Sequence, residues 1–133
     1  MDRREHLSQA LVVTLGGANI EHSYEIEGKL EADSKYSTEP QPRLAGGSSV
    51  NHSCRLLSLG INIHPILPLT EADPLHRIIV QELDNSASRG GSDYIISDLL
   101  IAGEHLTTPH TTIIRQGSAR ASLNEFSPKL IEK

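Results

Sequence analysis

Two short apolar runs along the chain predict buried strands. "ALVVTLGGA" (10–18) is continuous and ends in glycines, and "INIHPILPL" (61–69) is a second run of similar length. Runs of this kind are typical of strands covered on both faces, as in a parallel sheet. Pro65 and Pro68 limit how far the second strand pairs. A third apolar run, "DYIISDLLIAG" (93–103), predicts a further strand.

A helical pattern begins after the two glycines of "RLAGGSSVNHSCRLLSLG" (43–60). Ser48 or Ser49 is expected to cap this helix, because a serine oxygen accepts from a free backbone N–H in the first turn. Gly60 is placed to end it in the left-handed conformation. Its apolar positions recur at helical spacing, and they are Val50, Cys54, Leu56 and Leu57.

A second helix is predicted over 71–85, "EADPLHRIIVQELDN". Asp73 is a good N-cap, and Pro74 fits the first helical position. The segment 86–92, "SASRGGS", predicts a turn or flexible loop after the helix. The apolar stripe of the helix consists of Leu75, Ile78, Ile79 and Leu83.

The remaining segments are polar or β-branched. Residues 21–43 alternate weakly and predict an exposed ribbon, with a loop at 38–43 because prolines do not fit inside a ladder. Residues 111–123 predict a hairpin that turns at Gln116-Gly117, and 127–133 looks like a helix that has just begun.

This order of elements predicts an α/β fold with a mostly parallel sheet and flanking helices, in which 1–133 form a single domain. Ligands of such sheets bind beyond the carboxyl ends of the strands. The glycine-containing segments 16–21 and 46–51 both fall at such places, which makes them the candidate binding segments.

Composition narrows the classes of function. The chain has 133 residues, a formal net charge of −5 and only 3% aromatic residues, so nucleic acid and anionic membrane surfaces are poor partners. Cys54 is the only cysteine, which favours a reducing, cytoplasmic setting and a buried, unreactive thiol. The seven histidines show no recognised metal spacing, so no metal site is expected. Gly16-Gly17 lacks the full fingerprint of a dinucleotide-binding turn.

Three segments, in this order, resemble the N-terminal part of the ribokinase-like (PfkB-type) carbohydrate kinases. They are "VVTLGGANIEHSYEIEG", "AGGSSVNHSCRLLSLG" and "ILPLTEADPLHRIIVQEL". The resemblance covers residues 10–85, and the later part fits more loosely. It implies an α/β sandwich with a small β lid, which 21–43 would supply, and phosphoryl transfer from ATP with Mg²⁺ to a sugar hydroxyl.

The resemblance implies sugar contacts at five positions, namely Asn19, Glu21, Gly46, Gly47 and Asn51. Asparagine offers a donor and an acceptor to neighbouring hydroxyls, and glycine lets backbone approach a ring. Glu21 stands where the family most often has Asp, and a solvated carboxylate is as good an interpretation of it. Asp73 is a further candidate, although capping a helix already accounts for it.

The Gly-Ala-Gly-Asp motif that carries the family's catalytic Asp and anion hole is absent from this chain; "RGGSD" (89–93) is a poor imitation. No catalytic residue is therefore assigned, and the chain alone is expected to bind no ATP or Mg²⁺ and to be inactive. The alternative is a stand-alone, non-catalytic carbohydrate-binding or assembly module. A homodimer through the lid or an exposed sheet is expected in that case.

Overall fold

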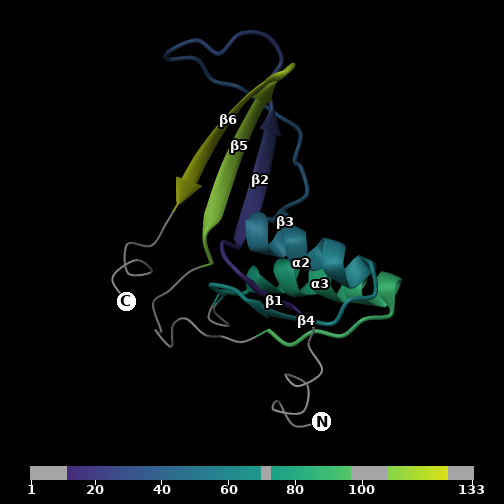
Figure 1. Cartoon of the computed structure of the whole chain (residues 1–133). Coiled ribbons are helices and arrows are strands. Elements are labelled where there is room, and N and C mark those ends of the chain that lie inside the picture. Colours follow the sequence, from purple (N-terminus) through teal and green to yellow (C-terminus); the bar gives the residue numbers. More distant parts are fainter. Residues whose placement is uncertain (1–11, 70–72, 97–107, 126–133) are drawn as a thin grey trace.

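The computed structural model describes residues 12–69, 73–96 and 108–125, and these form two parts (Figure 1). We call the first the helical body; it consists of β1 (Val12–Leu15), α2 (Ser48–Ser58), β4 (Ile63–Ile66) and α3 (His76–Gly90). We call the second the outer sheet; it consists of β2 (Asn19–Glu25), β3 (Leu44–Gly46), β5 (His110–Gln116) and β6 (Ala119–Glu125). In Figure 1 the long strands of the outer sheet rise away from the helices.

The helical body places α2 and α3 against a parallel pair of strands. β1 and β4 run in parallel with Val12 opposite Ile63, and Tyr94 bridges to Ile63 on the other side of β4. This confirms a parallel α/β arrangement. The buried core lies between helices and strands and comprises Ala18, Ile20, Val50, Leu57, Ile63, Leu67, Leu69, Ile79, Leu83 and Ala87.

The prediction that both faces of β1 are buried is wrong. Val13 and Leu15 are 60% and 73% exposed, whereas Thr14 is buried and shares a 2.8 Å hydrogen bond between its Oγ1 and Ser53 Oγ of α2. Because side chains alternate along a strand, only the face toward the helices is covered. An unbroken apolar run does not reveal which of its faces has a partner.

The predicted serine cap of α2 is also wrong. Gly47 is the N-cap residue, and no side chain caps the helix. The N–H of Ser49 instead donates to the carbonyl of Gly17, 3.2 Å away on the chain that leaves β1. The predicted end is confirmed: Gly60 has φ 81°, and the N–H groups of Gly60 and Ile61 donate to Leu57 and Leu56, as in a Schellman motif.

α3 begins and ends later than the pattern predicts. Leu75 is its N-cap residue, and Asp73 caps the preceding turn by accepting from the N–H of Leu75. The expected loop at 86–92 is helical as far as Gly90. Ser86 and Ala87 are buried there, and Gly90 lies so close to the carbonyl of Leu57 that a side chain would not fit. Burial against α2 thus overrides the weak helix propensity of serine and glycine.

The outer sheet has the strand order β3-β2-β5-β6. β2 and β5 are parallel, whereas β3 and β6 run antiparallel to their neighbours. The predicted hairpin is confirmed, with its turn at Gly117-Ser118 and Gly117 at φ 56°. Within 21–43 only 21–25 is strand, and 38–43 is a loop as predicted. Residues 97–103 and 127–133, predicted as part of a strand and a helix, lie outside the described residues.

Candidate functional site

Three of the five predicted sugar contacts meet where β2 and β3 begin their pairing. Asn19 lies opposite Gly46 in the register, and Glu21 lies two residues further along β2, on the same face. A Cβ placed on Gly46 would collide with Asn19 Oδ1 and Glu21 Oε1. The missing side chain of Gly46 therefore leaves the space in which these two oxygens lie.

Gly47 forms a tight corner between the two parts of the molecule. Its φ is 99°, and a Cβ there would lie 2.8 Å from the Cα of Ala18 and also strike the carbonyl of Gly17. Only glycine adopts this backbone without strain, and only glycine fits against the neighbouring chain. Gly47 thus holds the chain after β1 against the start of α2.

Asn51, the fifth predicted contact, lies in the first turn of α2. Its side chain is exposed, and its N–H donates to the carbonyl of Gly47 at 3.0 Å. No hydrogen bond within the described ranges joins its side chain to Asn19 or Glu21. The structure therefore does not join Asn51 to the other predicted contacts through its side chain.

Two polar residues on the same face as Asn19 were not foreseen from the sequence. Asn19 Nδ2 donates to Thr111 Oγ1 at 2.5 Å, and Thr111 Oγ1 donates to Asn124 Oδ1 at 2.9 Å. Thr111 lies on β5 and Asn124 on β6. Thr111 is 92 positions from Asn19 in the sequence. The β-branched pattern predicts their strands, but only the register between strands brings them beside Asn19.

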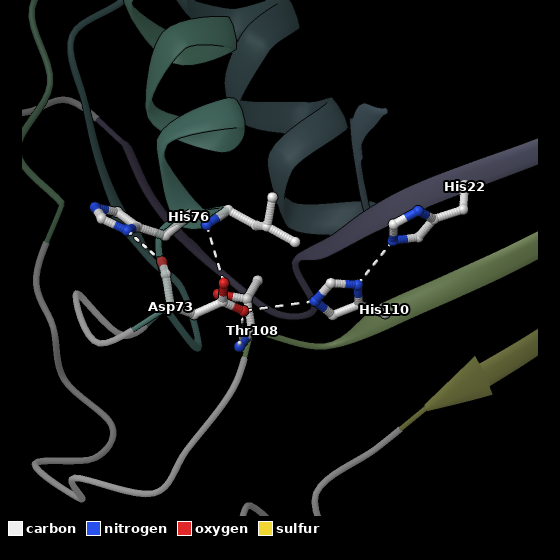
Figure 2. A network of polar contacts seen from close by, with 6 residues as sticks. His22, Asp73, His76, Thr108 and His110 are labelled. Atoms are coloured by element: carbon white, nitrogen blue, oxygen red, sulfur yellow. Dashed lines mark hydrogen bonds and ion pairs between the residues drawn. The ribbon is translucent and has the colours of Figure 1, made fainter. Parts of the chain in front are cut away.

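Asp73 lies in a separate network that joins α3 to the base of the outer sheet (Figure 2). Its two carboxylate oxygens accept from the N–H of Leu75 at 2.9 Å and from the N–H of Thr108 at 3.0 Å. His110 Nε2 lies 3.5 Å from Asp73 Oδ2, and His110 Nδ1 shares a 2.8 Å hydrogen bond with His22 Nε2. Asp73 thus acts as a clamp between α3 and the start of β5.

Burial and hydrogen bonding compete at this clamp. Burial alone would raise the pKa of Asp73, but the N–H of Leu75, the imidazole of His110 and the N–H of Thr108 together hold that pKa below its usual value. Burial lowers the pKa of His22, and the neighbouring His110 and Arg43 lower it further. These lowered pKa values favour an ionised Asp73 and a neutral His22 in the clamp.

The clamp and the Asn19 group lie on opposite faces of the outer sheet. Side chains alternate along β2, so His22 lies on the same face as Ile20, which is in the core, and Tyr24. Asn19, Glu21 and Ser23 lie on the other face. The two rings of His22 and His110 stack at 5.0 Å with an interplanar angle of 15°. The histidines accordingly support the sheet from behind and do not border the predicted sugar contacts.

A hollow of about 630 Å³ lies elsewhere, at the free edge of β1 against α2. Its lining includes Val13, Leu15, His52 and Arg55, and it contains none of the five predicted contacts. The hollow is open and its strand edge has no partner in the described ranges. Its open shape does not enclose a small ligand.

The glycine pair of "RGGSD" does not lie where an anion hole could form. Gly90 and Gly91, the glycine pair of "RGGSD", lie at the C-terminal end of α3. Carbonyl groups and the negative end of the helix dipole lie there, whereas an anion hole needs the N–H groups of a helix start. No group of three or more His, Cys, Asp or Glu side chains placed to hold a metal occurs in 12–69, 73–96 and 108–125.

The chain has a partial ribokinase-like fold, as solved structures of carbohydrate kinases show. A carbohydrate kinase from Agrobacterium tumefaciens matches 92% of this chain and 39% of its own, with a TM-score of 0.65 and 19% identity. A ribokinase from Arabidopsis thaliana, solved with ribose and ATP, matches 86% of this chain and 35% of its own, with a TM-score of 0.63 and 19% identity. A ribokinase from Cryptococcus neoformans, solved with ADP, matches 87% of this chain and 34% of its own, with a TM-score of 0.60 and 10% identity.

The chain therefore spans little more than a third of the length of these structures. At these low sequence identities, the structural similarity shows the fold alone. No protein-family model and no curated protein matches the sequence. Within the described ranges, neither helix is long and apolar enough to span a bilayer.

Proposed function

We propose that this chain is the sugar-binding part of an ATP-dependent carbohydrate kinase and is inactive by itself. The sugar would lie against Asn19, Glu21 and Gly46 on the outer sheet, with Gly47 forming the corner and Asn51 reaching in from α2. ATP and Mg²⁺ would be bound by residues that this chain does not contain. A cytoplasmic location, which rests on the single free Cys54, is part of the same proposal.

The observation that carries the proposal is the meeting of Asn19 Oδ1 and Glu21 Oε1 over Gly46. Asn19 Oδ1 is buried and has no hydrogen-bond partner among the described residues. A buried acceptor without a partner costs about 1–3 kcal/mol, which a donor from a ligand would recover. The structural neighbours are carbohydrate kinases and ribokinases, and one was solved with ribose, which supports a sugar as that ligand.

The test is a titration of the labelled chain with D-ribose, D-fructose and D-glucose, followed by amide NMR. We expect one of these sugars to shift the signals of Asn19, Gly46 and Gly47, and Glu21→Gln to weaken its binding by about tenfold, which corresponds to one lost charge-assisted hydrogen bond. Glu25→Gln, the same change further along β2, is the control and should bind as the wild type does. Site-specific binding that survives Glu21→Gln unchanged would remove Glu21 from the proposal.

Catalysis is tested separately, with a coupled assay for ADP release in the presence of Mg²⁺, ATP and each sugar. We expect no turnover above the buffer control, because the sequence lacks the Gly-Ala-Gly-Asp motif that carries the family's anion hole and catalytic Asp. Robust sugar-dependent turnover by the pure chain would show that the claim of inactivity is wrong.

A second candidate is a stand-alone, non-catalytic module that assembles as a homodimer. It is favoured by the face of the outer sheet that lies opposite Asn19 and Glu21. Tyr24, Ile114 and Ala121 follow one another across the strands there, and Leu123 next to them is 63% exposed. Light scattering distinguishes the candidates: a dimer that Leu123→Ser converts to monomer supports the module, and a monomer at all concentrations contradicts it.

A further inference from the structure

The hollow between β1 and α2 has a polar wall and an apolar wall. The polar wall is one side of α2 and includes Ser48, Ser49, His52 and Arg55. The apolar wall lies on β1, where Val13 and Leu15 are 60% and 73% exposed. No acidic side chain is among the described residues that line the hollow, so the fixed charge of Arg55 favours an anion there.

The start of α2 offers hydrogen-bond donors at one end of the hollow. The first N–H groups of a helix have no acceptor inside the helix, and no side chain caps α2. The N–H of Ser49 donates to the carbonyl of Gly17, but the hydroxyl of Ser49 is buried without a hydrogen-bond partner among the described residues. The first turn contains no acidic residue that would offset the positive end of the helix dipole. This helix start therefore keeps the donors and the partial charge that attract an anion.

Gly16, where the chain leaves β1, keeps the space beside these donors open. A Cβ on Gly16 would lie 3.4 Å from Ser49 Cβ and 3.6 Å from Ser48 Oγ, so the two serine side chains border the space that the missing side chain leaves. Ser49 is only 3% exposed, so bulk water does not satisfy its hydroxyl. Because serine has three staggered rotamers, a turn about χ1 redirects this hydroxyl at small cost. A buried donor without a partner is costly, and an anion beside the serines would offset that cost.

His52 and Arg55 continue the polar wall from Ser48. They lie four and seven residues after Ser48, which places all three on one side of α2. Side chains of a helix lean toward its N-terminus, so the guanidinium of Arg55 leans toward the serines. Arg55 forms no ion pair with a described residue. A guanidinium without an acidic partner is suited to bind two oxygens of a phosphate at once.

We propose that the start of α2 binds the phosphate group of a phosphate monoester, whose organic part lies along Val13 and Leu15. The phosphate oxygens accept from the hydroxyl of Ser49, from N–H groups of the first turn and from Arg55. The hollow does not enclose a ligand, so recognition rests on these donors at one end and on the apolar wall beside them. The inference is independent of the proposed function, because none of the five predicted sugar contacts lines the hollow.

The test is an amide NMR titration of the labelled chain with phenyl phosphate and, in parallel, with inorganic phosphate at constant ionic strength. We expect saturable shifts at Ser48, Ser49 and Val50 with both probes. Phenyl phosphate should also shift Val13 and Leu15 and bind at least about threefold more tightly, because its ring covers apolar surface. Equal affinity for both probes would contradict a monoester site and leave a site for free phosphate. Shifts that do not saturate with either probe would overturn the proposal.

The contribution of Arg55 is measured with Arg55→Gln, which should weaken the binding of phenyl phosphate by about tenfold through the loss of a charge-assisted contact. Arg77→Gln removes an exposed arginine of α3 that does not line the hollow, and it is the matched control. This control should bind as the wild type does. Equal weakening in the two variants would show a response to net charge alone and would contradict a site at α2.

Ser49→Ala separates binding from folding. The variant loses a buried hydroxyl that has no partner among the described residues, so its urea midpoint should equal or exceed that of the wild type. Its affinity for phenyl phosphate should fall by about threefold or more. Ser58→Ala, at the exposed other end of α2, is the control and should change neither quantity. Unchanged affinity in Ser49→Ala, or a lowered midpoint, would contradict the role of Ser49 as a donor to the ligand.

Discussion

The helical body and the outer sheet are stabilised in different ways. In the body, α2 and α3 pack on β1 and β4 around aliphatic side chains, and residues such as Leu57, Ile79 and Leu83 are fully buried. The outer sheet contributes Ile20 to that core, but every residue of β6 is exposed. Its strands are joined by their ladders and by polar contacts such as those of Thr111 and His110. Most of the buried aliphatic side chains therefore lie in the helical body, whereas the outer sheet relies more on its ladders and polar contacts.

The largest expected effect is the difference in stability lost when one leucine in each part is shortened to alanine. Leu83→Ala in α3 should lower the free energy of unfolding by about 2–5 kcal/mol, because it leaves a cavity in the packed core. Leu123→Ala in β6 should change it by less than about 0.5 kcal/mol, since that side chain is 63% exposed. Urea denaturation of both variants measures the contrast. Equal losses would show that the outer sheet has a core of its own.

The next largest effect is expected on the stability of the chain when Gly47, at the corner between the two parts, is replaced. Gly47→Ala should cost at least about 1–3 kcal/mol, because Gly47 has φ 99° and its Cβ would strike the backbone of Gly17 and Ala18. Gly17→Ala is the matched control: nothing lies within 4 Å of its added Cβ, so the free energy of unfolding should change by less than about 0.5 kcal/mol. A Gly47→Ala chain as stable as the wild type would mean that the corner is not rigid.

The clamp between α3 and β5 is tested with Asp73→Asn. One amide N–H would face the backbone N–H of Leu75 or Thr108, so we expect a loss of about 1–3 kcal/mol at pH 7. The folded pKa of Asp73 is lowered, so its contribution is present above the ordinary value of 3.8 and is lost as pH falls through the folded pKa. The gap between wild type and variant should therefore narrow below pH 3.8. A gap independent of pH would contradict an ionised clamp.

The smallest effect is the pH dependence that His22 adds at the base of the sheet. The unfolded chain binds a proton on His22 near pH 6.5, whereas the folded chain does so only at lower pH. The unfolded state then holds more protons, so stability falls as pH drops below 6.5. Burial lowers the pKa of His22 most, His110 and Arg43 lower it further, and Glu125 opposes them. His22→Gln should flatten this slope in denaturation curves between pH 7 and 5, and an unchanged slope would assign it to other groups.

Local patterns were sufficient to predict elements whose signals lie within a few residues. The hairpin, which turns at Gly117-Ser118, one residue later than predicted, and the end of α2 at Gly60 are confirmed because each needs a residue that accepts positive φ. The predicted cap of α2 was wrong because the N–H of Ser49 finds its acceptor in the distant carbonyl of Gly17. The predicted length of α3 was wrong because its last turn packs against the end of α2 at Leu57. The roles of Asn19, Glu21, Gly46, Gly47 and Asn51 as sugar contacts stay predictions.

The sequence by itself determined the α/β class, the two helices, the hairpin and the glycines that end α2 and turn the hairpin. These follow from periodicity and from backbone sterics, which act over short distances along the chain. Only the tertiary structure decided that Gly46 lies over Asn19 and Glu21, that Thr111 and Asn124 lie beside Asn19, and that Asp73 reaches Thr108. Those contacts depend on strand register and on residues up to 92 positions apart, as between Asn19 and Thr111, which no local pattern encodes.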